Sequence, residues 1–403
     1  MALNQIRHIH PTPLVVSGLE IRGGTISGGL IGDVQGNVNA TTGVSTFRII
    51  SGVGTAGISS AYISTLNDGP LAGSRNRIIN GDFRIDQRNV GAAQSISAGA
   101  APTYTVDRWF AYSAPVAIRG QQLTGIGSGA PVQNRYVFSA FNQVTSTSVL
   151  FGQRIESQNT HDLAGNVATL SVDIAHSASL TDTTGIGWTA FHPVFQPDTF
   201  GPLNAPTKVP FATGTILANG ASTRYSATFP VAIGATMGIE IIFSTIGIST
   251  SSAGIAATSS GASGGGVISF GNVQLERGPV ATPYERRSYA HELMLCQRYF
   301  EKTFAQNIAP AQNVNTFAGS ITGTGSAANV TFGAQWWFKV EKFATPSVIT
   351  YTPNAASATW STNTTTPTLA GAIFGNSGIY LNGTTAVTAG NNYSIHAIAS
   401  SEL

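Results

Sequence analysis

The sequence predicts an all-β protein, and three observations support this fold class. Charged residues make up only 9% of the chain while glycine occurs 46 times. Short stretches of alternating apolar and polar residues recur between Gly, Ser, Thr and Pro clusters, as is typical of strands with one buried face. A helical pattern stands out in one segment only. We therefore expect an N-terminal extended trimeric β shaft, a jelly-roll β-sandwich, one connecting α-helix and a C-terminal small β-sandwich.

Bulk composition argues against several classes of partner. The formal net charge is only +2 and Lys and Arg form no run, so we expect no nucleic acid partner. No apolar stretch reaches 18 residues, so we expect no membrane insertion. The single cysteine, Cys296, excludes an internal disulfide and a cysteine-based zinc site.

Residues 24–39 divide into the tetrads GTIS, GGLI, GDVQ and GNVN. Each begins with glycine and carries an aliphatic residue two places later, so on a strand both would share one face. The positions concerned include Gly28, Gly32 and Gly36 with Ile26, Leu30, Val34 and Val38. Identical chains meeting around an axis would place each aliphatic side chain over a neighbour's glycine. Residues 24–75 are therefore interpreted as an intertwined shaft, and a plain Gly-rich linker is the alternative.

Alternation recurs through residues 76–283, for which we expect the jelly-roll domain. The segment NVATLSVDIA, residues 166–175, places Ala168, Leu170, Val172 and Ile174 on one face. MGIEIIFSTI, residues 237–246, repeats this pattern. Many short strands separated by turn residues indicate a sandwich.

The predicted helix covers residues 284–303, where charge is dense. Tyr289, Leu293, Cys296 and Phe300 recur at spacings of four, three and four, which places them on one side of a helix. This stripe could pack on its own sandwich or meet its copies around the axis. A catalytic thiol at Cys296 is a third reading, but a cysteine in an apolar stripe usually belongs to a core. Residues 304–403 are expected to form the second, smaller β domain.

The chain resembles bacteriophage tail-fibre and related virion appendage proteins in several motifs. These are NRIINGDFRIDQRN, YTVDRW, VQLERGPVATPYERRSYAHELMLCQRYFEK and the ending HAIASSEL. The glycine tetrads resemble shaft repeats in phages of cyanobacteria. NGDF, GQRIE, LAGNVATLSVDIA and FGNVQLERG resemble strands of carbohydrate-binding-module jelly rolls.

The resemblance implies a homotrimeric structural protein of the phage particle, assembled in the bacterial cytoplasm. Residues 1–23 would attach it to the tail, the baseplate or another virion protein. Residues 304–403 would lie distally, as the candidate receptor-binding domain for a host surface polysaccharide. The alternatives are a head fibre, capsid decoration or baseplate protein without receptor binding, and a glycan depolymerase.

Sugar binding requires exposed aromatic faces beside amide and hydroxyl groups. The candidates in the distal domain are Trp337, Tyr351, Trp360 and Tyr393, and core packing is the alternative for each. Trp337 is the best of them, because strand alternation turns it away from Trp336.

The sequence offers two candidate metal sites, although we expect no required cofactor. The carbohydrate-module resemblance implies a structural calcium ion, for which Asn80, Asp82 and Asn272 could supply oxygen ligands. His8 and His10 would share one side of an extended chain, so in a trimer they could surround an axial metal ion. An ordinary anchoring segment is the alternative for the two histidines.

We expect no enzymatic activity and no catalytic residues. Asp82, Asp86 and Asp107 each lie beside an arginine, so salt bridging is the preferred interpretation, including a pair between Asp107 and Arg108 next to a half-buried Trp109. A depolymerase needs paired carboxylates, and after Glu301 the only acidic residues are Glu341 and Glu402.

Overall fold

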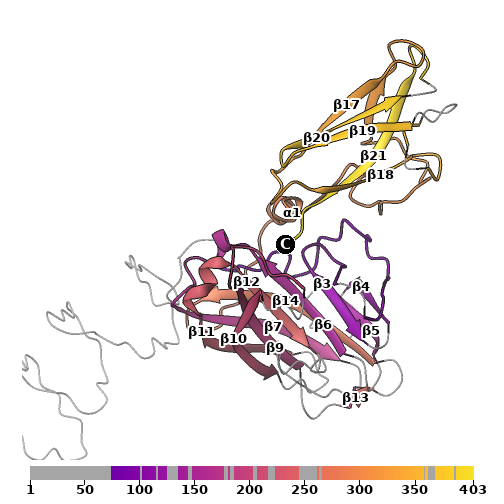
Figure 1. Ribbon diagram of the computed structural model, residues 1–403. Coiled ribbons are helices and arrows are strands. Elements are labelled where there is room, and N and C mark those ends of the chain that lie inside the picture. The colour runs from indigo at the N-terminus through magenta and orange to yellow at the C-terminus, as the bar shows by residue number, and fades with distance from the viewer. Residues whose placement is uncertain are drawn as a thin grey trace, which may run out of the picture. The chain divides into compact units, whose positions relative to one another are not determined.

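The computed structural model describes the chain from Ser74 onward, with gaps (Figure 1). The described ranges are 74–99, 102–114, 117–124, 135–143, 148–176, 180–181, 186–202, 207–216, 223–244, 261–262, 266–357, 359–361, 368–384 and 387–403. The anchoring segment 1–23 and the shaft 24–75, apart from its last two residues, lie outside them.

Two six-stranded antiparallel sheets form a β-sandwich, as the sequence predicts (Figure 1). The first has the order β1 (Gln94–Ile96), β4 (Ile118–Thr124), β5 (Tyr136–Gln143), β14 (Gly266–Arg277), β7 (Val167–His176) and β11 (Thr223–Pro230). The second has the order β10 (Lys208–Ile216), β9 (Ile186–Pro193), β12 (Ile239–Ser244), β6 (Ser148–Ile155), β3 (Phe110–Ala114) and β2 (Thr103–Tyr104). A short pair, β8 (Leu180–Thr181) with β13 (Gly261–Ala262), and two 3₁₀ helices, η1 (Ser157–Asn159) and η2 (Ile233–Met237), complete this part.

The sandwich core confirms the predicted alternation. Ala168, Leu170, Val172 and Ile174 of β7 are all buried in the main apolar cluster. The same cluster also contains Ile241 of β12 in the opposite sheet, so the facing surfaces of the two sheets share one core. Each buried Leu, Val or Ile side chain contributes roughly 1.5–3 kcal/mol relative to exposure.

The C-terminal part contains two smaller antiparallel sheets (Figure 1). In one, β21 (Asn392–Ser400) pairs with β15 (Phe300–Lys302), β16 (Ile321–Thr324) and β18 (Ser347–Tyr351). In the other, β20 (Gly378–Thr384) lies between β17 (Phe332–Trp337) and β19 (Thr368–Phe374). Their shared core includes Phe332, Leu381 and Ile395.

The connecting helix is shorter than predicted. It is α1 (Tyr289–Gln297), and Ser288 caps it by accepting a hydrogen bond from the backbone N–H of His291. Phe300 lies outside the helix in β15, because this segment pairs with β21 almost a hundred residues later. Tyr289 is half exposed, so the apolar stripe is reduced to Leu293 and the buried Cys296. Among the described residues, no helix has the length and apolar character to cross a membrane.

Charged side chains gather where α1 and the last residues of the chain contact the sandwich. Arg108, almost fully buried, donates to Glu402, and its guanidinium lies 3.4 Å from the centre of the Tyr299 ring. Arg298 binds Glu156 through two hydrogen bonds of 2.6 and 2.9 Å. The dense charge seen in the sequence is therefore largely used in ion pairs inside the fold.

Candidate functional site

The outer face of the β17–β20 sheet presents two aromatic rings. Trp337 is paired with Gly378, and Gln335 is paired with Tyr380. Because directly opposite residues of an antiparallel pair point to the same face, these four positions share one surface. Trp336 and Phe332 alternate to the other face and pack in the core. Trp337 is 65% exposed and Tyr380 is 39% exposed.

Glycines lie beneath both rings. A Cβ atom at Gly378 would lie 3.0 Å from Cε3 of Trp337, and a Cβ atom at Gly333 would overlap the Tyr380 ring. The rings therefore lie against the backbone of the neighbouring strand, in space that any other residue would fill. Gln335 is exposed beside them and offers an amide. The surface combines flat apolar faces with a hydrogen-bonding group, which is the combination that a sugar ring requires.

The four sequence candidates for sugar binding have different surroundings. Trp337 is exposed on the sheet face described above. Tyr351 is half-buried in β18 and makes an edge contact with Phe304 at 5.5 Å between ring centres. Trp360 and Tyr393 are fully buried, and Phe332 packs against both. The expectation for these last two is wrong, because a ring enclosed in the core has no face to present to a ligand.

Tyr380 was missed by the sequence reasoning. Its signal was present in the stretch GIYLN, where Ile379 and Leu381 alternate with Tyr380 and so place it on the outer face.

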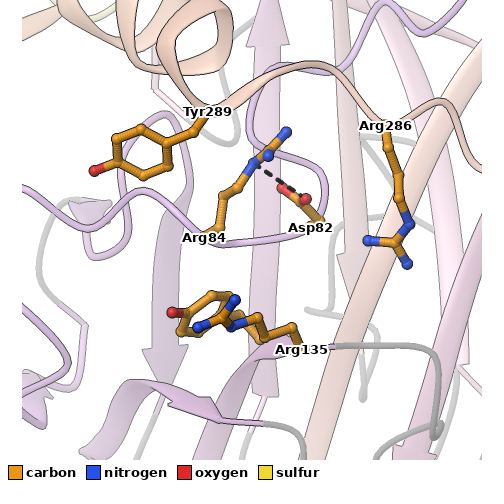
Figure 2. Close-up of a pocket in the computed structure, with 6 residues that line it drawn as sticks. Asp82, Arg84, Arg135, Arg286 and Tyr289 are labelled. Carbon is orange, nitrogen blue, oxygen red and sulfur yellow. Dashed lines mark ion pairs between the residues drawn. The ribbon is translucent and has the colours of Figure 1, made fainter.

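A second candidate site is a pocket of about 360 Å³ on the sandwich side of α1. It is lined by Asp82, Arg84, Arg135, Tyr136, Arg286 and Tyr289. Figure 2 shows the Arg84–Asp82 pair in the middle, with Tyr289 on one side and Arg286 on the other. The residues come from three separate segments: the chain before β1, the start of β5, and the approach to α1.

Contacts around the pocket hold its centre in place. Nε of Arg84 lies 3.2 Å from Oδ2 of Asp82, and Nη2 of Arg84 donates to the backbone carbonyl of Arg287 at 2.6 Å. Arg287 in turn pairs with Glu292 of α1. The predicted salt bridge of Asp82 is therefore present, and its partner is Arg84.

Burial dominates the electrostatics of Asp82. Removal from water raises the pKa of this carboxyl above its ordinary value, against the opposing effect of Arg84. Within the described part of the chain, the Oδ1 atom of Asp82 is buried and accepts no hydrogen bond. The pocket thus contains a carboxylate oxygen in need of a donor.

The surroundings of two of the three proposed calcium ligands disfavour that role. The side-chain amide of Asn80 donates to the carbonyls of Ile85 and Asp107, and its Oδ1 accepts from the Ile85 N–H at 3.0 Å. Asp82 pairs with Arg84 and lines a pocket with two further arginines, whose guanidinium groups repel a cation. The side-chain amide nitrogen of Asn272 donates to Asp173 at 2.7 Å. Among the described residues, no three His, Cys, Asp or Glu side chains gather as a metal site. His8, His10 and the shaft residues lie outside the described ranges.

The other acidic residues differ from expectation in their partners. Asp107 is fully buried, accepts a 2.6 Å hydrogen bond from the Gln87 amide and forms an ion pair of 3.8 Å with Arg88, so its expected salt bridge is present. Arg108 pairs with Glu402, so the predicted Asp107–Arg108 pair is wrong. Trp109 is fully buried instead of half-buried. Asp86 accepts hydrogen bonds from the backbone N–H groups of Asn89 and Gly91, and so closes a turn.

Comparisons with known proteins give structural similarities only. No family model matches the chain, and no curated protein matches its sequence. Among solved structures, the enzymatically active domain of tailspike protein 4 from bacteriophage CBA120 is similar with a TM-score of 0.27 and 14% identity, covering 53% of this chain and 23% of that one. The CBM22-1–GH10 modules of Clostridium thermocellum xylanase 10B give a TM-score of 0.26 and 16% identity, covering 50% and 30%.

A xylan-binding CBM22-1 domain from Paenibacillus barcinonensis Xyn10C is also similar. Its TM-score is 0.25 with 9% identity, covering 47% of this chain and 97% of that domain. The chain therefore spans less than a third of the first two structures and nearly all of this third one.

Proposed function

We propose that the chain is a structural protein of a bacteriophage particle, a tail fibre that binds a glycan on the host surface. The observation that carries the binding role is the outer face of the β17–β20 sheet, where Trp337 and Tyr380 lie exposed over Gly378 and Gly333.

The chemistry of this face suits a saccharide. The C–H groups on one side of a sugar ring form a flat apolar surface that packs on the negative face of an aromatic ring. Hydroxyl groups at the edge of the sugar can exchange hydrogen bonds with the exposed amide of Gln335. Exposed aromatic side chains grouped on one surface are typical of interaction sites. They stay in contact with water when the chain folds, so they contribute little to the stability of the fold.

The virion role is supported by the sequence motifs and by the glycine tetrads of residues 24–39. A three-chain shaft would present three copies of the sheet face on one rod. Linked copies bind a repetitive surface polysaccharide with an avidity far above that of one site, so each site can be weak. Residues 1–23 would hold the other end on the particle.

Binding without cleavage is part of the proposal. Of the acidic residues in the described C-terminal part, Glu301 is buried and pairs with Lys342 at 2.6 Å, while Glu341 accepts a hydrogen bond from Asn376. Glu402 pairs with Arg88 and Arg108. These three carboxylates are therefore engaged by cations or an amide, whereas glycoside hydrolysis uses two carboxyl groups that flank the sugar–sugar bond. Reducing-end release from a bound polysaccharide would instead identify a depolymerase.

A glycan array of bacterial surface polysaccharides tests the binding role. We expect the full-length chain to bind a restricted set of these polysaccharides. The variants Trp337→Ala and Tyr380→Ala should each lose this binding. Phe195→Ala is the matched control, because Phe195 is 71% exposed in the sandwich part. Equal signals from all four proteins, or no binding by any, would contradict the proposal.

Labelling of intact phage particles with an antibody against the chain tests the virion role. Electron microscopy should place the label on tail fibres. Label on the head or on the baseplate would favour the corresponding structural protein, and unlabelled particles would remove the virion role altogether.

A further inference from the structure

We propose that the pocket between Asp82, Arg135, Arg286 and Tyr289 binds an acidic sugar residue, with its carboxylate held by guanidinium groups. This site belongs to the sandwich, so the inference stands or falls independently of the aromatic face on the β17–β20 sheet.

The charge of the pocket favours an anion. Three guanidinium groups, those of Arg84, Arg135 and Arg286, line it beside the single carboxylate of Asp82. Arg84 is occupied with Asp82 and with the carbonyl of Arg287, so it serves mainly to fix the carboxylate. Arg135 and Arg286 enter from different segments and bring two further guanidinium groups to the cavity (Figure 2). A planar guanidinium matches a carboxylate with two parallel hydrogen bonds.

Asp82 distinguishes a sugar from a simple anion. Its Oδ1 atom is buried, and within the described residues it accepts no hydrogen bond. An anion without a hydrogen-bond donor would be repelled by this oxygen, whereas a hydroxyl group can donate to it. A sugar hydroxyl is such a donor, and a hexuronate residue has several of them close to its carboxylate.

The wall formed by Tyr289 supplies the third element. Tyr289 is the first residue of α1, and its side chain is half exposed at the side of the pocket (Figure 2). A phenol ring in this position can pack against the apolar side of a sugar ring. The volume of about 360 Å³ lies at the small end of the roughly 300–1,000 Å³ typical of small-molecule sites, which suits one sugar unit of a longer chain.

Titration calorimetry at low salt with acidic oligosaccharides tests the proposal on the full-length chain. The probes are trigalacturonate, trimannuronate and a sialic acid trimer, with the methyl ester of trigalacturonate as a neutral probe of matched shape and sulfate as a simple anion without a hydrogen-bond donor. We expect at least one acid trimer to bind, and the methyl ester and sulfate to bind roughly tenfold or more weakly.

Variants then assign the binding to the pocket. Arg135→Gln and Arg286→Gln should each weaken binding of the acid trimer roughly tenfold or more. Arg119→Gln, which removes the same charge from an exposed position on β4, should leave the affinity within about twofold. The melting temperatures of all three variants give the check on folding, and two independent pocket variants keep the test valid where one is unstable.

Three results would overturn the inference. They are failure of every acid trimer to bind, unchanged affinity in both pocket variants, and sulfate binding as tightly as the best trimer. Since Trp337→Ala leaves the pocket intact, binding of the acid trimer by that variant separates this site from the aromatic face.

Discussion

The indole of Trp337 lies across Gly378, its cross-strand partner in the β17–β20 pair. The Tyr380 ring likewise covers a glycine, but here the glycine is Gly333, which lies two positions along β17 from Gln335, the direct cross-strand partner of Tyr380. Small residues under flat rings let the aromatic faces lie along the sheet while remaining open to solvent. The glycines are therefore as much a part of the proposed binding face as the rings themselves.

Gly333→Ala should weaken glycan binding while leaving the fold intact. The added methyl group would overlap the Tyr380 ring and push it off the sheet. Alanine is favoured over glycine inside a strand by roughly 0.5–1 kcal/mol, so the free energy of unfolding should change by no more than about that amount. The double variant Gly333→Ala with Tyr380→Ala should bind like Tyr380→Ala alone, because both changes act through one ring. Additive losses would show that Gly333 acts in another way.

Glu402→Gln should strongly destabilise the protein. It removes the charge that balances Arg108, whose side chain is almost fully buried, and also the partner of Arg88. An unbalanced buried charge costs about 3–5 kcal/mol, measurable by urea denaturation. Glu341→Gln removes an exposed carboxylate and should change the free energy of unfolding by less than about 0.5 kcal/mol. Equal effects of the two changes would contradict this role of Glu402.

Stability should fall as the pH rises from about 4 to about 7. Burial raises the pKa of Asp107 to about 7 from an ordinary value of 3.8. In this window the folded carboxyl holds a proton that the unfolded chain has lost, so its contribution is complete below pH 4 and lost on passing pH 7. Asp107→Asn should flatten the profile by an amount on the order of a few kcal/mol. A variant profile parallel to that of the wild type would exclude Asp107 as the cause.

Cys296 should be unreactive in the folded protein. Its thiol is fully buried, and burial raises its pKa well above the ordinary value. Iodoacetamide at pH 8 should therefore label the native chain roughly a thousandfold or more slowly than the urea-denatured chain, since only unfolded molecules expose the thiol. Rapid labelling of the native protein would contradict this burial and support the alternative interpretation of Cys296 as a nucleophile.

Local pattern predicted the sandwich strands well because their burial repeats every second residue. The stretch that became β7 is an example, with Ala168, Leu170, Val172 and Ile174 in the core. The same logic placed Trp337 opposite to Trp336. These features depend on neighbours in the sequence, which a single chain displays directly.

Long-range pairing accounts for what sequence reasoning missed. Phe300 fits a helical spacing, yet its segment joins β21 and so ends the helix early. Trp360 and Tyr393 are buried by packing with Phe332, which no local pattern reveals. The pocket was missed for a related reason, since Arg135 lies about fifty residues after Asp82 and about 150 residues before Arg286.

The most direct test of glycan binding by the β17–β20 face is the affinity of the full-length chain and of Trp337→Ala for the saccharide that binds best on the array. Isothermal titration calorimetry gives both dissociation constants, and thermal melting checks that the variant is folded. We predict that Trp337→Ala binds roughly tenfold or more weakly with an unchanged melting temperature, as expected for loss of a central aromatic contact. An unchanged dissociation constant in a folded variant would contradict the assignment of this face as the binding site.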